Sequence, residues 1–282
     1  MVRKLSDCIE QAEELALSGK FEEALAKYGE AIGEDPADPL TYVGKASILK
    51  ALGRYAECAD CMDTAIRILP EWKGADVDKA SDLASMLLVL KAEAQLYAEK
   101  PEEALLTVDE ADKIREADAA SLVVRAQAYA QQKKYEEAGN CLYRAEEWCF
   151  LHDDAMLTQI WLSKVHIAKE SGKAFAPPYA AEVYKSGNWR KPAGTAEELF
   201  ERGNNLRGEG LLYDALRYYD ACLAAGPENR ALVLFFKGII FEQLKNFTEA
   251  YSMYSDALAA GPAPEDELKI RVRWMNAKSL RL

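Results

Sequence analysis

A block of about 34 residues recurs along the chain, and this repetition limits the possible folds more than any other feature. Copies at residues 19–36, 53–70 and 246–262 read GKFEEALAKYGEAIGEDP, GRYAECADCMDTAIRILP and NFTEAYSMYSDALAAGP. Each has an aromatic residue, a small residue three positions later, a second small residue seven positions beyond that, and a closing proline. A further small residue lies twelve positions before the first. The small residues of the four best copies are Ala12/Ala24/Ala31, Ala46/Cys58/Ala65, Ala126/Ala138/Ala145 and Gly238/Ala250/Ala257.

Two more copies keep this spacing but lack the aromatic residue, which is replaced by Pro101 in one and Leu212 in the other. Their small residues are Ala92/Ala104/Ala111 and Gly203/Ala215/Cys222. Equivalent positions in neighbouring copies lie 34 or 35 residues apart, as from 24 to 58, from 104 to 138 and from 215 to 250. The step from 58 to 104 is 46 residues, which indicates an insertion at 71–84.

Within each block the pattern predicts two antiparallel helices. In the first copy, residues 6–17 and 22–33 carry apolar side chains at intervals of three and four, with a turn at Ser18–Lys20 between them. Small residues let two helix axes approach closely. One hairpin cannot bury its own apolar face, so successive hairpins must stack on each other.

The repeat closely resembles the tetratricopeptide repeat in its period, its small residues and its closing proline, over roughly four-fifths of the chain. The resemblance implies an all-α fold, a right-handed α-solenoid of antiparallel helix hairpins with a C-terminal capping helix. The tryptophan typical of the family's first helix is absent, and other side chains occupy its place: Cys8, Tyr42, Leu88, Leu122, Leu199 and Leu234.

We expect four parts along the chain. Residues 1–151 form an N-terminal block of four repeats, at about 5–38, 39–70, 85–118 and 119–151, with the insertion at 71–84. Residues 152–194 form a degenerate hairpin and linker, with helices over 153–171 and from Pro178 to about Lys185, and a bend at 186–194. Residues 195–262 form a C-terminal block of two repeats, and residues 263–282 a solvating helix.

The last helix carries an apolar stripe at Leu268, Val272, Met275 and Leu282. We expect this helix to cover the last hairpin, as the terminal helix of a repeat array does. The alternative is a detachable helix that binds a partner or another copy of the chain.

Charge and composition exclude several classes of partner. The 282 residues hold 35 Lys and Arg against 47 Asp and Glu, a net charge of −12, which argues against nucleic acid and against an anionic membrane surface. The acidic surplus lies in residues 1–151. The longest strongly apolar stretch, 231–241, is too short to span a bilayer, and we expect no signal peptide at the N-terminus, because no apolar stretch follows its two basic residues. With six scattered cysteines, the cytoplasm is the expected location.

No recognised catalytic or metal-binding motif occurs in the sequence. Cys58 and Cys61 form a C-x-x-C, but Cys58 stands at a small-residue position of the repeat and two further zinc ligands are missing. The two histidines, His152 and His166, have no serine or cysteine partner at a recognised spacing. We therefore expect no enzyme activity, no cofactor and no metal.

The family resemblance implies where a partner would bind. In the first helix of each hairpin, the side chains three before and one after the first small residue project into the concave face. In this chain they are Ile9, Glu13, Val43, Ser47, Val89, Glu93, Val123, Gln127, Phe200, Asn204, Phe235 and Ile239. Asn204 and Arg207 resemble a fragment of the clamp that holds chaperone tails in some family members, but Ile9, Glu13 and Gly44 replace that clamp in the first units.

The expected function is a non-catalytic scaffold or adaptor that binds a peptide or helical segment of a protein partner in this groove. One alternative is a self-associating assembly factor, in which the partner is another copy of the chain. Others are a co-chaperone-like adaptor and, from a different class, an enzyme or metal protein that uses the cysteines.

Overall fold

The computed structural model describes residues 2–72, 74, 76–152, 155–172, 175–187 and 189–281. These residues form fifteen α-helices, one short 3-10 helix and no β-strand, apart from an isolated bridge between Phe175 and Leu211. The expected all-α fold is confirmed. The helices divide into two compact units, Met1–Lys134 (the N-terminal unit) and Tyr135–Leu282 (the C-terminal unit).

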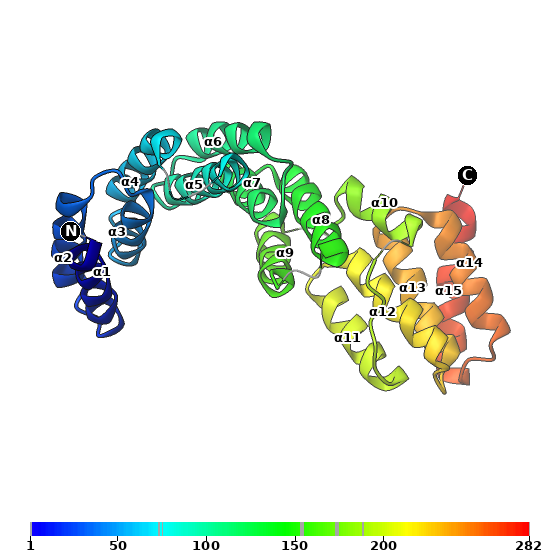
Figure 1. Cartoon of the computed structure of the whole chain (residues 1–282). Helices are drawn as coiled ribbons and strands as arrows, with labels where there is room; N and C mark the ends of the chain where they lie inside the picture. The colour runs from blue at the N-terminus through cyan, green and yellow to red at the C-terminus, as the bar shows by residue number, and fades with distance from the viewer. Residues whose placement is uncertain are drawn as a thin grey trace. The chain divides into compact units, whose positions relative to one another are not determined.

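The N-terminal unit consists of helix hairpins in two layers. Helix α1 packs on α2, α3 on α4 and α5 on α6, and α5 also contacts α7. Helices α1, α3, α5 and α7 lie on the lower side of this unit in Figure 1, and α4 and α6 lie above them. The helices are α1 (Val2–Leu17), α2 (Phe21–Glu34), α3 (Pro39–Ala51), α4 (Tyr55–Ile68), α5 (Val77–Tyr97), α6 (Pro101–Ile114) and α7 (Ala119–Gln131), with the 3-10 helix η1 (Leu69–Glu71) after α4.

The residues that carry the repeat pattern form the contacts between these helices. Ala12, Ala24, Ala46, Ala92 and Ala104 are each 0% exposed, as expected for side chains at close helix–helix crossings. Two of the turns use glycine in the left-handed conformation, Gly19 at φ of +76° and Gly53 at +73°, whereas Glu99 and Lys133 take this conformation after α5 and α7.

Asp38 caps the N-terminus of α3. The Asp38 carboxylate accepts hydrogen bonds from the backbone N–H groups of Leu40 and Thr41, both at 3.2 Å, and Pro39 occupies the first helical position. Each of the repeat's local signals therefore has a direct structural counterpart here.

The C-terminal unit combines two regular hairpins with an irregular part. Helix α11 packs on α12 and α13 on α14, whereas α8 packs on both α9 and α10, and α10 contacts α12 (Figure 1). A capping box between Thr195 and Glu198 starts α11. The helices are α8 (Tyr135–His152), α9 (Leu157–Ser171), α10 (Pro178–Ser186), α11 (Ala196–Gly208), α12 (Leu212–Ala225), α13 (Arg230–Gln243), α14 (Phe247–Ala259) and α15 (Pro264–Leu280).

Some boundaries differ from the expected ones. Helix α9 starts at Leu157 rather than at 153, and Asp153 and Asp154 lie outside the described residues. Much of the insertion expected at 71–84 forms the first turns of α5, which is 21 residues long; Lys73 and Ala75 are outside the described residues.

The division into compact units falls between α7 and α8, the two helices of the fourth expected repeat. The bend expected at 186–194 lies inside the C-terminal unit, and Asn188 within it is not described. The repeat boundaries themselves stay a prediction.

Helix α15 packs on α14 through a different face from the one expected. Ile270 and Ala277 are the buried side chains of this helix, whereas Leu268, Val272 and Met275 are 70%, 45% and 56% exposed. The remaining stripe position, Leu282, lies outside the described residues. Helix α15 therefore lies on the last hairpin, but it meets α14 through the face that holds Ile270 and Ala277, seven residues apart, and not through the apolar stripe.

Candidate functional site

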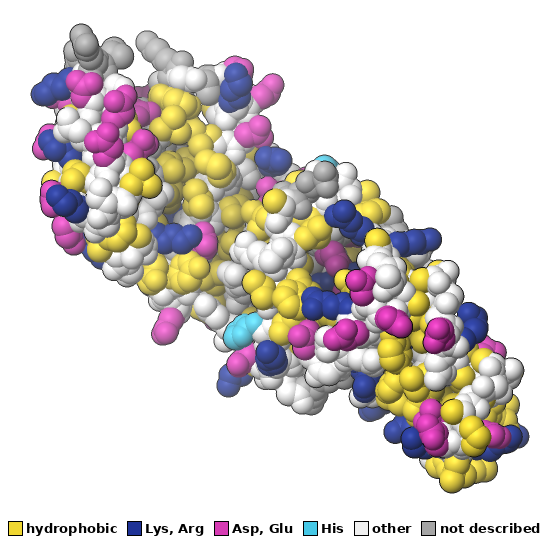
Figure 2. All heavy atoms as spheres, turned by 90° about the horizontal axis from the view of Figure 1, so that it is seen from below, with side chains coloured by type: hydrophobic (Ala, Val, Ile, Leu, Met, Phe, Trp, Pro, Cys, Tyr) yellow, Lys and Arg dark blue, Asp and Glu magenta, His cyan; other side chains and the backbone are white. Residues whose placement is uncertain are grey.

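The inner helices of the N-terminal unit bring a set of apolar side chains to one face. Figure 2 shows hydrophobic side chains gathered in a hollow of this unit, between rims of acidic and basic side chains. Ile9 of α1, Val43 of α3 and Val89 of α5 are half-buried, and Glu13 and Ser47 are exposed beside them. We call the surface formed by these residues of α1, α3 and α5 the inner face.

Two of the expected groove residues are not available to a partner. Val123 is 1% exposed and Phe235 is 8% exposed, so both belong to the core. The positional rule predicts the direction in which a side chain leaves its helix, but neighbouring side chains cover these two. Gln127, one turn beyond Val123, is half-buried.

Two residues that the sequence analysis missed extend the inner face. Leu40 and Met86 lie three residues before Val43 and Val89, on the same face of α3 and α5, and are 49% and 46% exposed. They expose more apolar surface than the expected positions. Extending the rule by one helical turn toward the N-terminus would have identified both.

An ion pair joins α3 to α5 at one end of the inner face. Lys50 Nζ lies 2.8 Å from Glu93 Oε2 and 5.5 Å from the centre of the Tyr97 ring. Tyr97 is half exposed and stacks on Tyr55 at 5.1 Å between ring centres. The carboxylate expected in the groove at Glu93 is therefore already paired with a cation.

The expected groove residues of the C-terminal unit contact one another or their neighbours. Phe200 lies 5.7 Å from Phe236 between ring centres, and the Arg207 guanidinium lies 4.9 Å from the same Phe236 ring. Asn204 Oδ1 accepts a hydrogen bond of 2.8 Å from the Tyr219 hydroxyl. Ile239 is half-buried. The two residues that resembled a clamp fragment, Asn204 and Arg207, thus have aromatic partners within the unit.

A network of buried charges lies in the C-terminal unit, and the sequence analysis did not predict it. Lys164 Nζ lies 3.0 Å from Glu146 Oε2 and 3.3 Å from Asp214 Oδ1, and Arg217 Nη1 lies 2.7 Å and 3.4 Å from the same two oxygens. The Tyr143 hydroxyl donates to Asp214 Oδ2 at 2.5 Å, and the Lys164 ammonium sits 3.5 Å from the centre of its ring. We call these five residues the charge network.

Burial and pairing shift the ionisation of this network. Burial alone would raise the pKa of Glu146, but the charges of Lys164 and Arg217 outweigh it and lower this pKa to about 2. Burial, with the nearby Asp214 carboxylate, raises the pKa of the Tyr143 hydroxyl well above its usual value. Glu146 is therefore ionised and Tyr143 is neutral at physiological pH.

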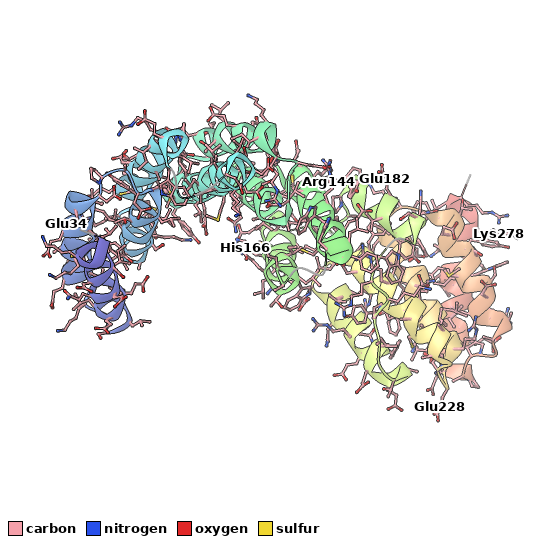
Figure 3. The ribbon with its side chains drawn as sticks, in the orientation of Figure 1. Glu34, Arg144, His166, Glu182, Glu228 and Lys278 are labelled. Atoms are coloured by element: carbon pink, nitrogen blue, oxygen red, sulfur yellow. The ribbon has the colours of Figure 1, made fainter. Side chains whose placement is uncertain are left out.

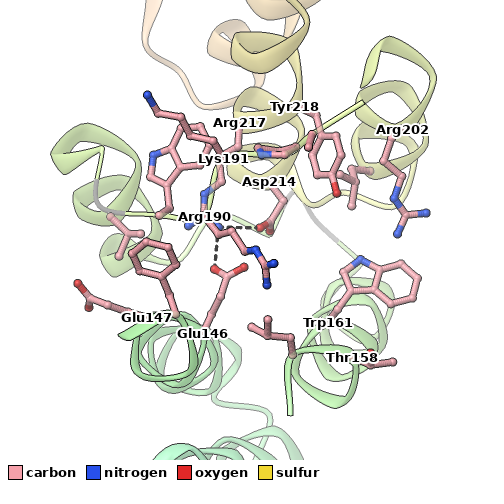
Figure 4. Close-up of a pocket in the computed structure, with 17 residues that line it drawn as sticks. Glu146, Glu147, Thr158, Trp161, Arg190, Lys191, Arg202, Asp214, Arg217 and Tyr218 are labelled. Atoms are coloured by element: carbon pink, nitrogen blue, oxygen red, sulfur yellow. Dashed lines mark hydrogen bonds and ion pairs between the residues drawn. The ribbon is translucent and has the colours of Figure 1, made fainter. Parts of the chain in front are cut away.

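The charge network borders a cavity of about 510 Å³. Helices α8, α9, α10, α11 and α12 and the segment 189–193 surround it. In Figure 4, Arg190 reaches toward the middle of the cavity, and the indole nitrogen of Trp161 is turned toward it. Besides three network residues, the lining consists of Glu147, Phe150, Leu157, Thr158, Trp161, Val183, Trp189, Arg190, Lys191, Pro192, Ala193, Arg202, Leu206 and Tyr218.

The cysteines occupy core positions. Cys58 is 3% exposed, and burial raises the pKa of its thiol to about 11, so the reactive thiolate is scarce at neutral pH. Burial also raises the pKa of Cys61. No group of three or more His, Cys, Asp or Glu side chains suited to a metal occurs among the described residues.

The two histidines lie at the surface. His166 is exposed on α9, as Figure 3 shows, and His152 stacks on Trp148 with 4.1 Å between ring centres. No helix in the described part of the chain is long and apolar enough to cross a membrane.

Comparison with solved structures finds matches of low sequence identity. The type IV pilus biogenesis factor PilW matches at 13% identity and a TM-score of 0.47, over 90% of this chain and 92% of its own. A tetratricopeptide repeat protein from Parabacteroides merdae matches at 14% identity and a TM-score of 0.44, over 98% of this chain and 99% of its own. A chain of the APC/C Cut9–Hcn1 hetero-tetramer matches at 12% identity and a TM-score of 0.43, over 97% of this chain but only 42% of its own.

Comparison with curated proteins gives no match. Two family models, both described as tetratricopeptide repeat, do match the sequence, one at residues 40–71 and 119–150 and the other at 200–263. These segments contain repeats that the small-residue spacing had identified, and their helices form hairpins such as α3 with α4 and α13 with α14. The chain is therefore a protein with tetratricopeptide repeats in these segments.

Proposed function

We propose that the chain is a non-catalytic scaffold that binds a peptide or helical segment of a protein partner on the inner face of the N-terminal unit. The proposal rests chiefly on one observation, the row of accessible apolar side chains on adjacent inner helices. Leu40 and Val43 belong to α3 and Met86 and Val89 to α5, and the Lys50–Glu93 ion pair connects these two helices. A monomeric solvated surface has little reason to gather such side chains in a hollow.

The inner face suits an amphipathic segment. Burying the apolar side of the ligand against these side chains would contribute about 25 cal/mol of binding free energy per Å² of apolar area. The cost of ordering the ligand reduces this gain. Glu13 and the pair of Lys50 with Glu93 offer polar contacts at its margin. The partner expected from this chemistry is a helix or extended peptide with an apolar stripe.

The test compares two variants of the full chain in affinity capture from the native lysate. Leu40→Lys with Met86→Lys places charge on the inner face at two half-exposed positions, so the fold should tolerate it. Leu106→Lys, at a 66% exposed position of the outer helix α6, is the matched control. Circular dichroism verifies that all three proteins are folded.

We expect wild type and the α6 control to retain the same amount of partner. The inner-face variant should retain at least about tenfold less, since binding would bury each lysine as an unpaired charge. Retention that is equal in all three proteins would move the binding site elsewhere. Light scattering of the purified chain separates a foreign partner from self-association.

A further inference from the structure

The cavity of the C-terminal unit is bordered by buried hydrogen-bond donors without acceptors. Among the described residues, Trp161 Nε1, Trp189 Nε1, Arg217 Nε and Arg217 Nη2 are buried and have no hydrogen-bond partner. All three side chains line this cavity of about 510 Å³. Folded proteins leave few buried donors unpaired, because each costs about 1–3 kcal/mol. Four such donors around one cavity indicate a ligand rich in acceptor atoms.

Arg217 is oriented for such a ligand. Its Nη1 is occupied by Glu146 and Asp214, while Nε and Nη2 form the opposite edge of the guanidinium, whose two parallel N–H groups can bind an oxyanion bidentately. The side chain is 5% exposed and lies between the rings of Tyr143 and Trp189, each 5.5 Å away. These contacts hold the guanidinium in place before any ligand arrives.

The charges around the cavity favour an anion. The Glu146 and Asp214 carboxylates are both bonded to Lys164 and Arg217. Arg190, Lys191 and Arg202 have no acidic partner in the described part of the chain, while Glu147, which accepts a hydrogen bond from the Tyr179 hydroxyl, contributes the one further carboxylate of the lining. Three cations against one carboxylate leave a surplus of two positive charges.

Donor number and charge together distinguish a phosphate from a carboxylate. A phosphate monoester carries about −1.5 to −2 charges at pH 7 and three strong acceptor oxygens, whereas a carboxylate carries one charge and two oxygens. The surplus charge and the four free donors correspond to the phosphate. Phe150, Leu157, Val183 and Leu206 supply apolar surface for the body that carries it.

We propose that this cavity binds a phosphate group attached to a larger body. A phosphorylated side chain of a peptide and a phosphorylated small molecule share this chemistry. The site is independent of the inner face of the N-terminal unit, so either proposal can fail without the other.

Isothermal titration of the full chain with a set of probes tests the proposal. The probes are phenyl phosphate, its carboxylate counterpart benzoate, inorganic phosphate, and a short blocked peptide with and without a phosphate on its central tyrosine. We expect phenyl phosphate to bind at least about tenfold more tightly than benzoate, since its third acceptor oxygen and its larger negative charge can engage more of the free donors and cations. Equal affinity for the two, or no binding of any phosphate-bearing probe, would overturn the proposal.

Variants connect the binding to the cavity. Trp161→Phe with Trp189→Phe removes two of the free donors but keeps an aromatic ring at each position. Arg190→Gln with Arg202→Gln removes two of the cations that have no acidic partner among the residues that the structure describes. Each pair of substitutions should lower the affinity for phenyl phosphate about tenfold. Trp148→Phe and Lys185→Gln, which change a tryptophan and a cationic residue outside the cavity lining, should leave the affinity unchanged. Unchanged affinity in both cavity variants would contradict the assignment.

The remaining probes identify the source of the phosphate. Binding of the phosphorylated peptide, but not of its unphosphorylated form, supports the cavity as a phosphopeptide site. Binding of phenyl phosphate or inorganic phosphate without the peptide supports a phosphorylated small molecule in the same cavity.

Discussion

The two units of this protein bury different kinds of polar side chain. In the described part of the N-terminal unit the buried polar residues are neutral: Thr41, Gln95, Thr107 and Ser121. In the described part of the C-terminal unit they are charged: Lys164, Asp214, Arg217 and Lys237. Both units use the same small residues at their helix crossings. Lys164 of the irregular helix α9 meets Asp214 and Arg217 of the regular helix α12 in one network, whereas Lys237 of α13 pairs with Asp220 of α12.

This difference suggests what holds an irregular hairpin in place. Regular hairpins are positioned by interlocking small and large apolar side chains, which need no buried charge. The α9 and α10 helices lack the repeat's small-residue spacing, and side-chain bonds connect them to neighbouring helices instead. Lys164 links α9 to α8 and α12, and the Tyr184 hydroxyl of α10 donates to Asp220 of α12 at 2.6 Å. Buried charges impose a geometry because misplacing one leaves it unpaired.

The largest expected effect comes from breaking the charge network. Lys164→Met leaves the Glu146 and Asp214 carboxylates with one cation between them, and it should lower the free energy of unfolding by about 3–5 kcal/mol. The matched change in the N-terminal unit is Thr107→Val, which removes a buried neutral hydrogen bond of 2.8 Å to Gln95 and should cost only about 1–2 kcal/mol. Urea unfolding followed by circular dichroism measures both. Equal costs would remove the proposed distinction between the units.

The next effect is a dependence on pH that belongs to the C-terminal unit. Glu146 has a pKa of about 2 in the folded chain, below its ordinary value, so its contribution is complete above pH of about 4.5 and is lost as the pH falls toward 2. We expect a loss of about 2–3 kcal/mol over that range.

Tryptophan fluorescence can follow this loss, because four of the five tryptophans, all except Trp72, lie in the C-terminal unit. In Glu146→Gln the free energy of unfolding should fall less steeply as the pH is lowered toward 2, and it should be lower than that of wild type at pH 7. If the free energy of unfolding of this variant falls as steeply with pH as that of wild type, other carboxylates cause the pH dependence.

A smaller effect should be common to both units. A methyl group at Gly44 or Gly238 would lie 2.5 Å and 2.3 Å from the rings of Tyr28 and Tyr254, so each Gly→Ala change should cost about 1–3 kcal/mol. At Gly33, inside α2, nothing lies within 4 Å, and alanine should stabilise the chain by about 0.5–1 kcal/mol through helix propensity. Thermal unfolding measures all three. A tolerated alanine at Gly238 but not at Gly44 would show that hairpin packing differs between the units.

Much of the fold was predictable because the repeat acts through local spacing. The small residues are buried as expected, Asp38 and Thr195 cap their helices, and the turn at Gly19 is left-handed. Spacing predicts which residues share a helix face, and a repeated unit extends that information to its neighbours.

The charge network could not be predicted in this way, because it joins residues far apart in the sequence. Glu146 and Arg217 are 71 positions apart, and their meeting depends on how α8 and α12 pack. One local signal was present: Lys164 lies between Ile160 and Ile167 on a stripe of α9 that is otherwise apolar, and it is 1% exposed. Likewise, the face on which α15 packs depends on rotation about its own axis, and spacing alone does not determine it.

The central claim, that the inner face of the N-terminal unit holds a protein partner, is tested most directly by site-specific photo-crosslinking. A photoreactive phenylalanine analogue is placed at position 86 on α5 or at position 106 on α6 of the full chain, and the crosslinked peptides are sequenced after exposure to the captured partner. The account predicts crosslinks from position 86 to an apolar segment of the partner and none from position 106. Crosslinks from position 106 alone would contradict it and place the partner on the outer layer of helices.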